Sequence, residues 1–211
     1  MSNKFYDITF TDDVKAAQEH YGSRRQFERM RVIGEKNAVL GDLEFDFIEQ
    51  RDGFYMATVG ADGQPYMQFR GGNAGFLKVL DERTIAFADF RGNLQYISVG
   101  NLGGANKKSA LFLMDYANRR RLKILAETEI KDASEVPELI AKLKDQNYEA
   151  KIERAVIFHI EAFDWNCPQH ITPRYTLEEI KQMVEPLNAH IEKLEKEIEK
   201  LKAEKLKAEK L

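Results

Sequence analysis

Short apolar runs recur through the middle of the chain, and their alternating pattern predicts β-strands. Between residues 54 and 165, runs such as F-Y-M-A-T-V and T-I-A-F-A-D are rich in aromatic and β-branched residues, and turns such as A-D-G-Q separate them. Six or seven such strands, joined mostly by tight turns, predict an antiparallel barrel instead of a parallel sheet with crossover helices. We also expect a short helix after Arg91 and a helix at residues 134–146 that is capped by Ser134.

Before these strands the spacing of apolar residues is helical. Asp12 is a possible cap for a first helix that ends at Gly22, and Ser23 for a second that ends at Gly34. A third helix is expected at residues 42–50, with one apolar face formed by Leu43, Phe47 and Ile48. Residues 1–51 are therefore expected to form a helical segment that packs on the barrel.

Residues 176–211 have a different, seven-residue repeat. β-Branched residues at position a and mostly leucine at position d favour a parallel two-stranded coiled coil, in which Glu197 at g meets Lys202 at e of the partner helix. The alternative is an amphipathic helix that lies on its own domain. Pro186 is expected to begin the long helix, with a shorter helix at 176–184 before it. The seam consists of Val184, Ile191 and Ile198 at a, and Ile180, Leu187, Leu194 and Leu201 at d.

The chain thus divides into residues 1–51, a barrel at 52–175 and a helical tail at 176–211. Its 211 residues carry a net charge of -3, so no general basic field indicates a nucleic-acid partner. A single cysteine cannot form an internal disulfide, which fits a reducing cytoplasm. No apolar run approaches the roughly 20 residues that span a bilayer, so no membrane partner is expected.

Polar residues gather where the predicted strands end. Guanidinium groups, hydroxyls and backbone amides at the start of a helix are the groups that bind a phosphate. Each residue also has a simpler interpretation, since Asn93 could cap the short helix and Asn101 could end it. The residues that we expect to bind an anionic, planar ligand are Gln68, Arg70, Lys78, Arg91, Asn93, Gln95, Ser98 and Asn101.

The segment D-W-N-C-P-Q-H-I-T-P-R at residues 164–174 follows the last predicted strand. Trp165, Gln169 and His170 could border a flat ring system. Cys167 lies three residues before His170, but Pro168 between them disfavours a catalytic pair. His159 is expected to be packed within a strand.

Three segments together resemble the flavin-nucleotide-binding relatives of pyridoxamine 5'-phosphate oxidase. They are R-G-G-N-A-G-F-L-K-V-L-D, F-A-D-F-R-G-N-L-Q-Y-I-S-V-G-N-L and the D-W-N-C-P-Q-H-I-T-P-R segment, and the similarity covers residues 25–175. The resemblance implies a split β-barrel that forms a homodimer with FMN at the interface. It places Arg70 and Lys78 at the phosphate or ribityl chain, and Arg91, Asn93, Gln95 and Ser98 in the turn that binds the phosphate. Trp165, Gln169 and His170 match the segment with which the second subunit covers the flavin.

The chain departs from the oxidase at two places. The oxidase has consecutive basic residues where this chain has Arg91 followed by G-N-L-Q, and a tryptophan-arginine-leucine segment where this chain has D-W-N-C-P-Q-H-I. We therefore expect a cytoplasmic, mainly β protein that binds FMN and acts as an oxidoreductase on a small substrate or electron donor. His170 would be the proton donor. The alternatives are a non-catalytic flavin carrier or sensor, and a haem-binding split barrel with His159 or His170 as the iron ligand.

Overall fold

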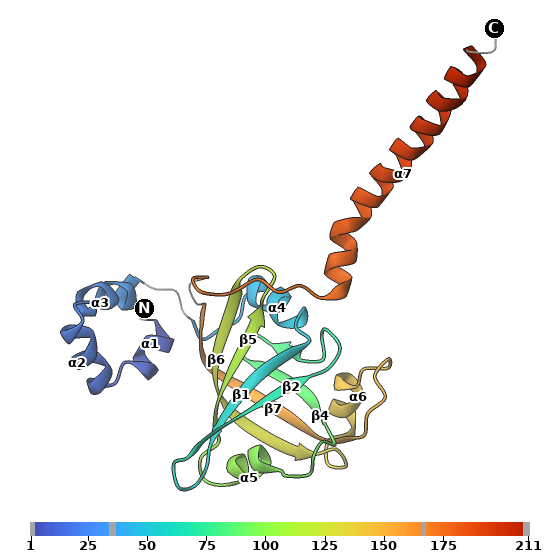
Figure 1. Cartoon of the computed structure of the whole chain (residues 1–211). Coiled ribbons are helices and arrows are strands. Elements are labelled where there is room, and N and C mark those ends of the chain that lie inside the picture. The colour runs from blue at the N-terminus through green and yellow to red at the C-terminus, as the bar shows by residue number, and fades with distance from the viewer. Residues whose placement is uncertain (1–2, 34–36, 166–167, 209–211) are drawn as a thin grey trace. The chain divides into compact units, whose positions relative to one another are not determined.

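The computed structural model describes residues 3–33, 37–165 and 168–208 (Figure 1). Cys167 and the expected helix end at Gly34 lie outside these residues. The chain forms two compact units. The first comprises Met1–Asp115 and Arg119–Gln169, and the second comprises Tyr116–Asn118 and His170–Leu211.

The first unit begins with four short helices: α1 (Lys4–Thr9), α2 (Asp12–His20), α3 (Arg24–Ile33) and α4 (Asp42–Glu49). The sequence did not predict α1. The cap of α2 is Thr11 and not Asp12, because the Thr11 hydroxyl accepts a hydrogen bond from the backbone N–H of Val14 at 3.4 Å. Gly22 adopts a φ of 76° after this helix, as expected from its position.

Helix α4 buries a slightly different face from the expected one. Phe47 and Ile48 are buried, whereas Leu43 is 55% exposed, so its predicted place on the apolar face is wrong. Glu44 is buried in its stead. Its carboxylate accepts hydrogen bonds from the indole N–H of Trp165 at 2.6 Å and from the backbone N–H of Gly41 at 3.0 Å. A charged residue can occupy this face because both partners are available.

Seven antiparallel strands form one sheet, and with the flanking helices they confirm the expected mainly β fold class. The order across the sheet is β2-β1-β5-β6-β7-β4-β3. Most strands coincide with the predicted runs, and β3 begins two residues after the apolar run that predicted it. The strands are β1 (Gly53–Val59), β2 (Pro65–Gly71), β3 (Lys78–Asp81), β4 (Thr84–Phe90), β5 (Lys108–Asp115), β6 (Arg120–Asp132) and β7 (Ile152–Trp165).

The burial of each strand follows from what covers it. In β1 the buried side chains Phe54, Met56 and Thr58 alternate with partly exposed ones, as in a sheet with one covered face. Strand β4 is buried on both faces from Ile85 to Asp89, because α6 (Pro137–Leu143) lies over its outer face. This helix begins with Pro137 and has no side-chain cap, so the predicted cap by Ser134 is wrong.

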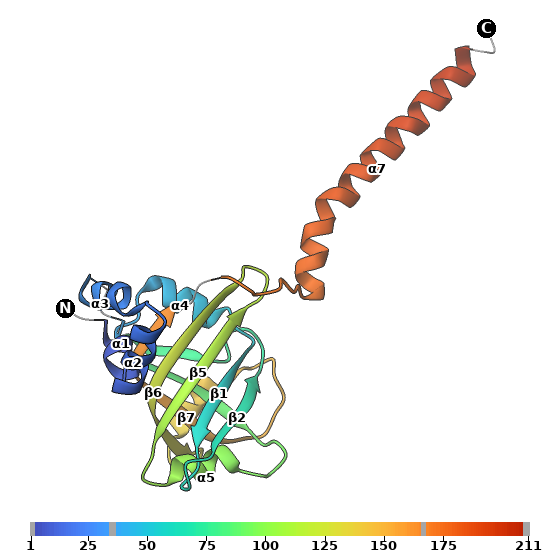
Figure 2. The same ribbon diagram turned by 60° about the vertical axis from the view of Figure 1, so that its left-hand side comes forward.

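Side chains connect the two ends of the curled sheet. Strand β2 is the first in the order and β4 the sixth, yet Arg70 of β2 and Asp89 of β4 form an ion pair at 2.9 Å. Backbone hydrogen bonds do not join these two strands, which gives the split β-barrel expected from the sequence. Helix α5 (Ile97–Gly103) lies at one end of the barrel and α4 at the other (Figures 1 and 2).

The second unit is dominated by one long helix, α7 (Leu177–Ala208). Thr176 caps it, since its hydroxyl accepts from the backbone N–H of Glu179 at 3.2 Å and its own N–H donates to the Glu179 carboxylate at 2.7 Å. Pro186 lies inside this helix, so the predicted division into two helices is wrong. An interior proline removes one backbone hydrogen bond, and on an exposed helix water can take its place. Of the helices in the described part of the chain, none is long and apolar enough to cross a bilayer.

Candidate functional site

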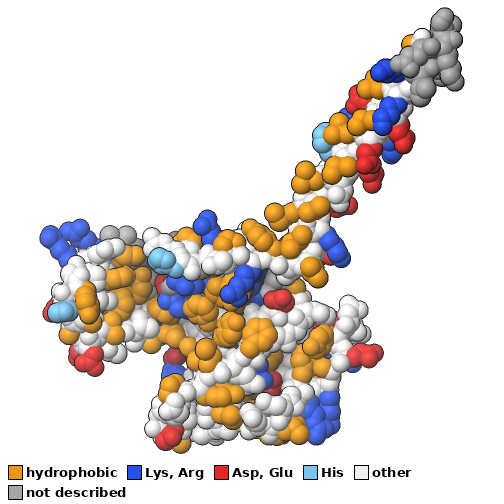
Figure 3. All heavy atoms as spheres, viewed as in Figure 1, with side chains coloured by type: hydrophobic (Ala, Val, Ile, Leu, Met, Phe, Trp, Pro, Cys, Tyr) orange, Lys and Arg blue, Asp and Glu red, His pale blue; other side chains and the backbone are white. Residues whose placement is uncertain are grey.

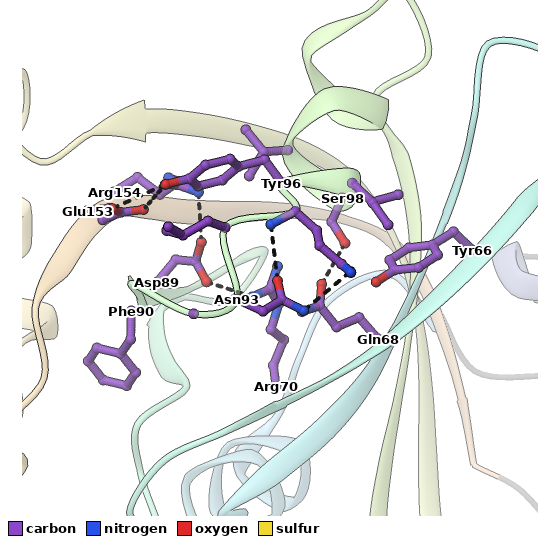
Figure 4. Close-up of a pocket in the computed structure, with 15 residues that line it drawn as sticks. Tyr66, Gln68, Arg70, Asp89, Phe90, Asn93, Tyr96, Ser98, Glu153 and Arg154 are labelled. Carbon is purple, nitrogen blue, oxygen red and sulfur yellow. Dashed lines mark hydrogen bonds and ion pairs between the residues drawn. The ribbon is translucent and has the colours of Figure 1, made fainter.

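A small polar hollow lies where β2, the end of β4, the first residues of β7 and the start of α5 meet (Figure 4). Its free volume is about 30 Å³, so it admits only small groups. Five of the predicted ligand-binding residues line it: Gln68, Arg70, Asn93, Gln95 and Ser98. The other lining residues include Tyr66, Asp89, Tyr96, Glu153 and Arg154, which the sequence did not single out.

A buried carboxylate between two arginines forms the base of the hollow. Asp89 is only 3% exposed, and its two oxygens lie 2.9 Å from Nη1 of Arg70 and 3.3 Å from Nη1 of Arg154. Burial raises the pKa of the Asp89 carboxyl above its ordinary value, and the two guanidinium groups only partly offset this effect. The three side chains thereby connect β2, β4 and β7.

Arg70 has one polar atom that its own chain leaves without a partner. Its Nε is fully buried and makes no hydrogen bond within the described residues. Buried donors are almost always satisfied in folded proteins, by protein, water or a ligand. A water molecule or a ligand could therefore accept from this N–H, as from the Nε groups of Arg31 and Arg121, which are also buried without a partner among the described residues.

A second carboxylate organises the rim. Glu153 forms ion pairs with Arg154 and, at 3.6 Å, with Nε of Arg91, and it accepts a hydrogen bond from the Tyr96 hydroxyl at 3.3 Å. The guanidinium of Arg154 also lies over the Tyr96 ring, 5.0 Å from its centroid. Arg91 itself does not line the hollow, whose two lining arginines balance Asp89 and Glu153 when both are ionised. Together with Arg91 beside Glu153, the cluster carries one positive charge in excess. The site is thus suited to an anion.

The loop between β4 and α5 is a compact turn with two residues in left-handed conformations. Leu94 has φ 63° and Tyr96 has φ 51°, which is uncommon for residues with bulky side chains. Asn93 stabilises the turn, because its side-chain oxygen accepts from the backbone N–H of Gln95 at 3.1 Å. Asn93 therefore does not cap α5, whose N-cap is Tyr96 without a side-chain hydrogen bond.

The hydroxyl and amide groups of α5 face the strands. Ser98 donates to the side-chain oxygen of Gln68 at 3.1 Å, and the Asn101 amide donates to the Thr58 hydroxyl at 3.0 Å. Asn101 thus lies within the helix and does not end it. These contacts hold α5 against β1 and β2 and fix the position of Ser98 in the hollow (Figure 4).

The structure places the remaining predicted residues elsewhere. Lys78 pairs with Ala86 in the sheet and does not line the hollow. Hydrogen bonds from Asn147 and Asn73 lower the pKa of Asp145, and the Lys78 charge adds a smaller effect in the same direction. Trp165 is held in its own barrel by Glu44.

The three predicted histidine and amide positions are all exposed. Gln169 and His170 are exposed, and His170 has φ 62°. His159 was expected to be packed, but its side chain is 54% exposed and lies 3.6 Å from Glu129. Groups of three or more histidine, cysteine or acidic side chains able to hold a metal ion are absent from the described residues.

The sequences of β4 and β7 contain a signal that could have identified Asp89 and Arg154. Asp89 follows the apolar run T-I-A-F-A in β4, and Arg154 precedes the run A-V-I-F in β7. The two residues are direct neighbours across the β4–β7 ladder. Charged residues at the ends of buried strands need partners of opposite charge, which could have pointed to this pair.

No protein-family model matches the sequence, and no curated protein matches it either. Solved structures do resemble it. A candidate pyridoxamine 5'-phosphate oxidase from Lactobacillus delbrueckii is 21% identical over 61% of this chain and 96% of that one, with a TM-score of 0.48. An FMN-binding protein from Syntrophomonas wolfei is 14% identical over 71% and 97% of the two chains, with a TM-score of 0.46.

A third similar structure, an F420 reductase, is 19% identical over 56% of this chain and 94% of that one, with a TM-score of 0.41. The similar structures are thus pyridoxamine 5'-phosphate oxidase-like and flavin-related proteins, as the sequence motifs suggested. At these identities the likeness concerns the fold alone. What the chain binds has to be inferred from its own residues.

Proposed function

We propose that the chain binds FMN and that the hollow at Arg70, Asn93 and Ser98 receives the phosphate end of the cofactor. The observation that carries this proposal is the buried Nε of Arg70, which lacks an acceptor among the described residues. A phosphate oxygen would accept this hydrogen bond, and the excess positive charge of the cluster favours an anion. The side-chain amides of Asn93 and Gln95 supply further donors, and the Ser98 hydroxyl would become one if it turned away from Gln68.

The size of the hollow limits what can lie inside it. About 30 Å³ is far too small for a three-ring isoalloxazine. The ring would lie outside, where a second chain can cover it, and entry of the phosphate would move the side chains of the turn at residues 92–96. The proposal therefore includes a homodimer with two flavins at the interface.

The outer face of the sheet supports the homodimer. Met67 and Phe69 on β2 are 66% and 57% exposed, although both are large and apolar. In the strand register Phe69 pairs with Tyr55 of β1, which pairs with Phe112 of β5, so an aromatic row crosses three strands. Such a row is suited to bury itself against a second copy of the barrel.

The proposed activity is that of an oxidoreductase with a small-molecule substrate or electron donor. A bound flavin supplies the hydride and electron transfer, and protein residues hold and orient it. Trp165 would contact the flavin of the second subunit with its ring face. Its indole N–H already donates to Glu44 and so needs no hydrogen-bond acceptor on the flavin. Gln169 would add a hydrogen bond to the ring, and His170 would give or take a proton there.

A visible spectrum of the purified protein tests the cofactor. We expect the absorption bands of oxidised flavin, release of the pigment by acid, and a mass that matches FMN. A Soret band would instead support haem, and colourless protein that ignores added FMN would contradict the proposal. Turnover with a nicotinamide cofactor or a screened substrate would separate an enzyme from a flavin carrier.

A single substitution tests the site. Arg91→Ala should weaken FMN binding by about 1.5–3 kcal/mol, because it removes a charge-assisted contact to the phosphate. Arg83→Ala is the matched control, since Arg83 is also half-exposed and also lies beside one carboxylate, that of Glu82. Equal FMN affinity of the two variants in a fluorescence titration would remove Arg91 from the site.

A further inference from the structure

The long helix α7 exposes a continuous apolar seam. The seven side chains at heptad positions a and d lie between 39% exposed, for Val184, and 60% exposed, for Leu187. Figure 3 shows apolar side chains following one another along this helix. A soluble protein rarely leaves so long an apolar stripe in contact with water.

The chemistry of the flanking positions indicates which surface can cover this seam. Positions e and g, on either side, carry mainly charged or polar groups, with Met183 at g as the apolar exception: Lys181, Asn188, Glu195 and Lys202 at e, and His190 and Glu197 at g. The apolar stripe is therefore too narrow for a flat sheet, which would bury these charges as well. A second α7 helix fits, because its own seam has the same width and spacing.

We propose that two α7 helices pair in parallel and in register, within the same dimer whose barrels share the flavins. This inference rests on the homodimer of the proposed function. The charges at e and g select the direction. In a parallel pair, position g meets position e five residues later in the second helix, so His190 faces Glu195 and Glu197 faces Lys202.

An antiparallel pair brings like charges together. The antiparallel alignment that pairs each position a with a position d places Val184 opposite Leu201 and keeps six of the seven apolar residues in layers. In an antiparallel pair the e positions face each other, so Lys181 then lies opposite Lys202 at both ends of the pair. The parallel arrangement has no such repulsion. Pro186 occupies position c, which faces away from the seam in either arrangement.

Symmetry indicates that the two helices belong to one dimer. A barrel dimer with two-fold symmetry carries two α7 helices, and a parallel pair has its two-fold axis along the helices. The barrel dimer and the helix pair can share one two-fold axis, so the assembly closes with two chains. Pairing between dimers would leave each dimer joined to others and would give tetramers or open chains.

Disulfide trapping of the full chain tests the direction and the register. We would place one cysteine in the seam with Leu201→Cys and remove the native thiol with Cys167→Ser. In the parallel pair the two introduced thiols face each other, and mild oxidation should convert most of the protein to a covalent dimer. In the antiparallel pair they would be about 25 Å apart, given a rise of 1.5 Å per residue. A covalent link only in a variant that carries both Val184→Cys and Leu201→Cys would therefore overturn the proposal.

A matched pair of substitutions tests whether the seam holds the helices together. Ile191→Asp puts a carboxylate into position a and should lower the trapped fraction by at least about tenfold. Ala189→Asp makes the same charge change at the outward position f and should leave trapping unchanged. Equal trapping in the two backgrounds would mean that the thiols met by collision and not in a coil.

Light scattering and flavin content separate the possible failures. A mass of about twice 24.4 kDa with efficient trapping supports the proposal, whereas four or more chains would show pairing between dimers and overturn it. A dimer that keeps FMN without trapping would mean that only the coil inference is wrong. Efficient trapping in protein that binds no FMN would contradict the proposed function and leave the coil intact.

Discussion

Asp89 shows how one buried residue sets conditions for both folding and binding. Its carboxyl lies between Arg70 and Arg154 and connects three strands of the barrel. Because burial raises its pKa, the folded protein holds the Asp89 proton more tightly than the unfolded chain does. The sequence predicted Arg70 but not this partner, since Asp89 ends an apolar strand and gives no sign of which strand lies across the barrel.

The substitution Asp89→Asn should change how the free energy of unfolding depends on pH. At acidic pH we expect the two proteins to be about equally stable, because asparagine resembles the protonated Asp89 carboxyl and is likewise uncharged. At neutral pH the variant should be the more stable of the two, because burial disfavours the ionised carboxylate. The contribution of the Asp89 proton is fully present below the ordinary pKa of 3.8 and disappears as the pH rises through the raised value in the folded state. The stability of the native protein relative to the variant should therefore decrease over this pH range.

Urea denaturation of both proteins between acidic and neutral pH measures this difference. Asp13→Asn, at an exposed position of α2, provides the control and should change the free energy of unfolding little at any of these pH values. A difference that stays constant with pH would show that Asp89 titrates alike in the folded and unfolded chain.

At the scale of elements, the strands were predictable and the helix boundaries less so. The alternation of buried and partly exposed side chains in β1 could be predicted from the sequence, and so could the tight turn at Gly63, whose φ is 88°. The N-terminal helix α1 was missed because six residues give too short a pattern, and its cap depends on Asn3, whose side chain accepts from Tyr6 N–H. The position of Pro186 was misjudged because exposure to water, which lowers the cost of an interior proline, cannot be read from spacing.

Two glycines, one just after β2 and one inside α5, differ in how closely their neighbours pack around them. A Cβ at Gly72, just after β2, would lie 2.8 Å from Cβ of Phe76, which is buried in the core and cannot move aside. Gly72→Ala should therefore lower the free energy of unfolding by about 1–3 kcal/mol. Gly100 in α5 has open space around it, so Gly100→Ala should raise stability by up to about 1 kcal/mol through helix propensity. Thermal denaturation of the two variants measures the contrast, and equal effects would contradict the packing at Gly72.

At the scale of the whole molecule, the chain exposes two apolar surfaces on which the proposed self-association rests. The aromatic row on the outer sheet face and the seam of α7 are separate surfaces, one in each unit. The sequence predicted the seam, because a seven-residue repeat is visible without a structure. It did not predict the aromatic row, which exists only once the strand register brings Phe69, Tyr55 and Phe112 side by side.

Removal of residues 187–211 separates the contributions of these surfaces. We expect the shortened protein to remain a dimer with bound FMN, because the barrels supply the interface. Its melting temperature should be lower and more dependent on concentration, since the linked helices no longer keep the two chains together. Light scattering gives the mass, and a clean monomer would mean that α7 alone holds the dimer.

The lone tryptophan gives this protein an internal optical reporter. Trp165 is the only indole in the chain, it donates to Glu44 of α4, and the Arg120 guanidinium lies 4.7 Å from its ring centroid. Its fluorescence therefore reports on a single location, the contact between α4 and the last strand. Release of that helix would shift the emission to longer wavelength, and a nearby flavin would quench it by energy transfer, so local loosening and cofactor occupancy can be followed in unlabelled protein.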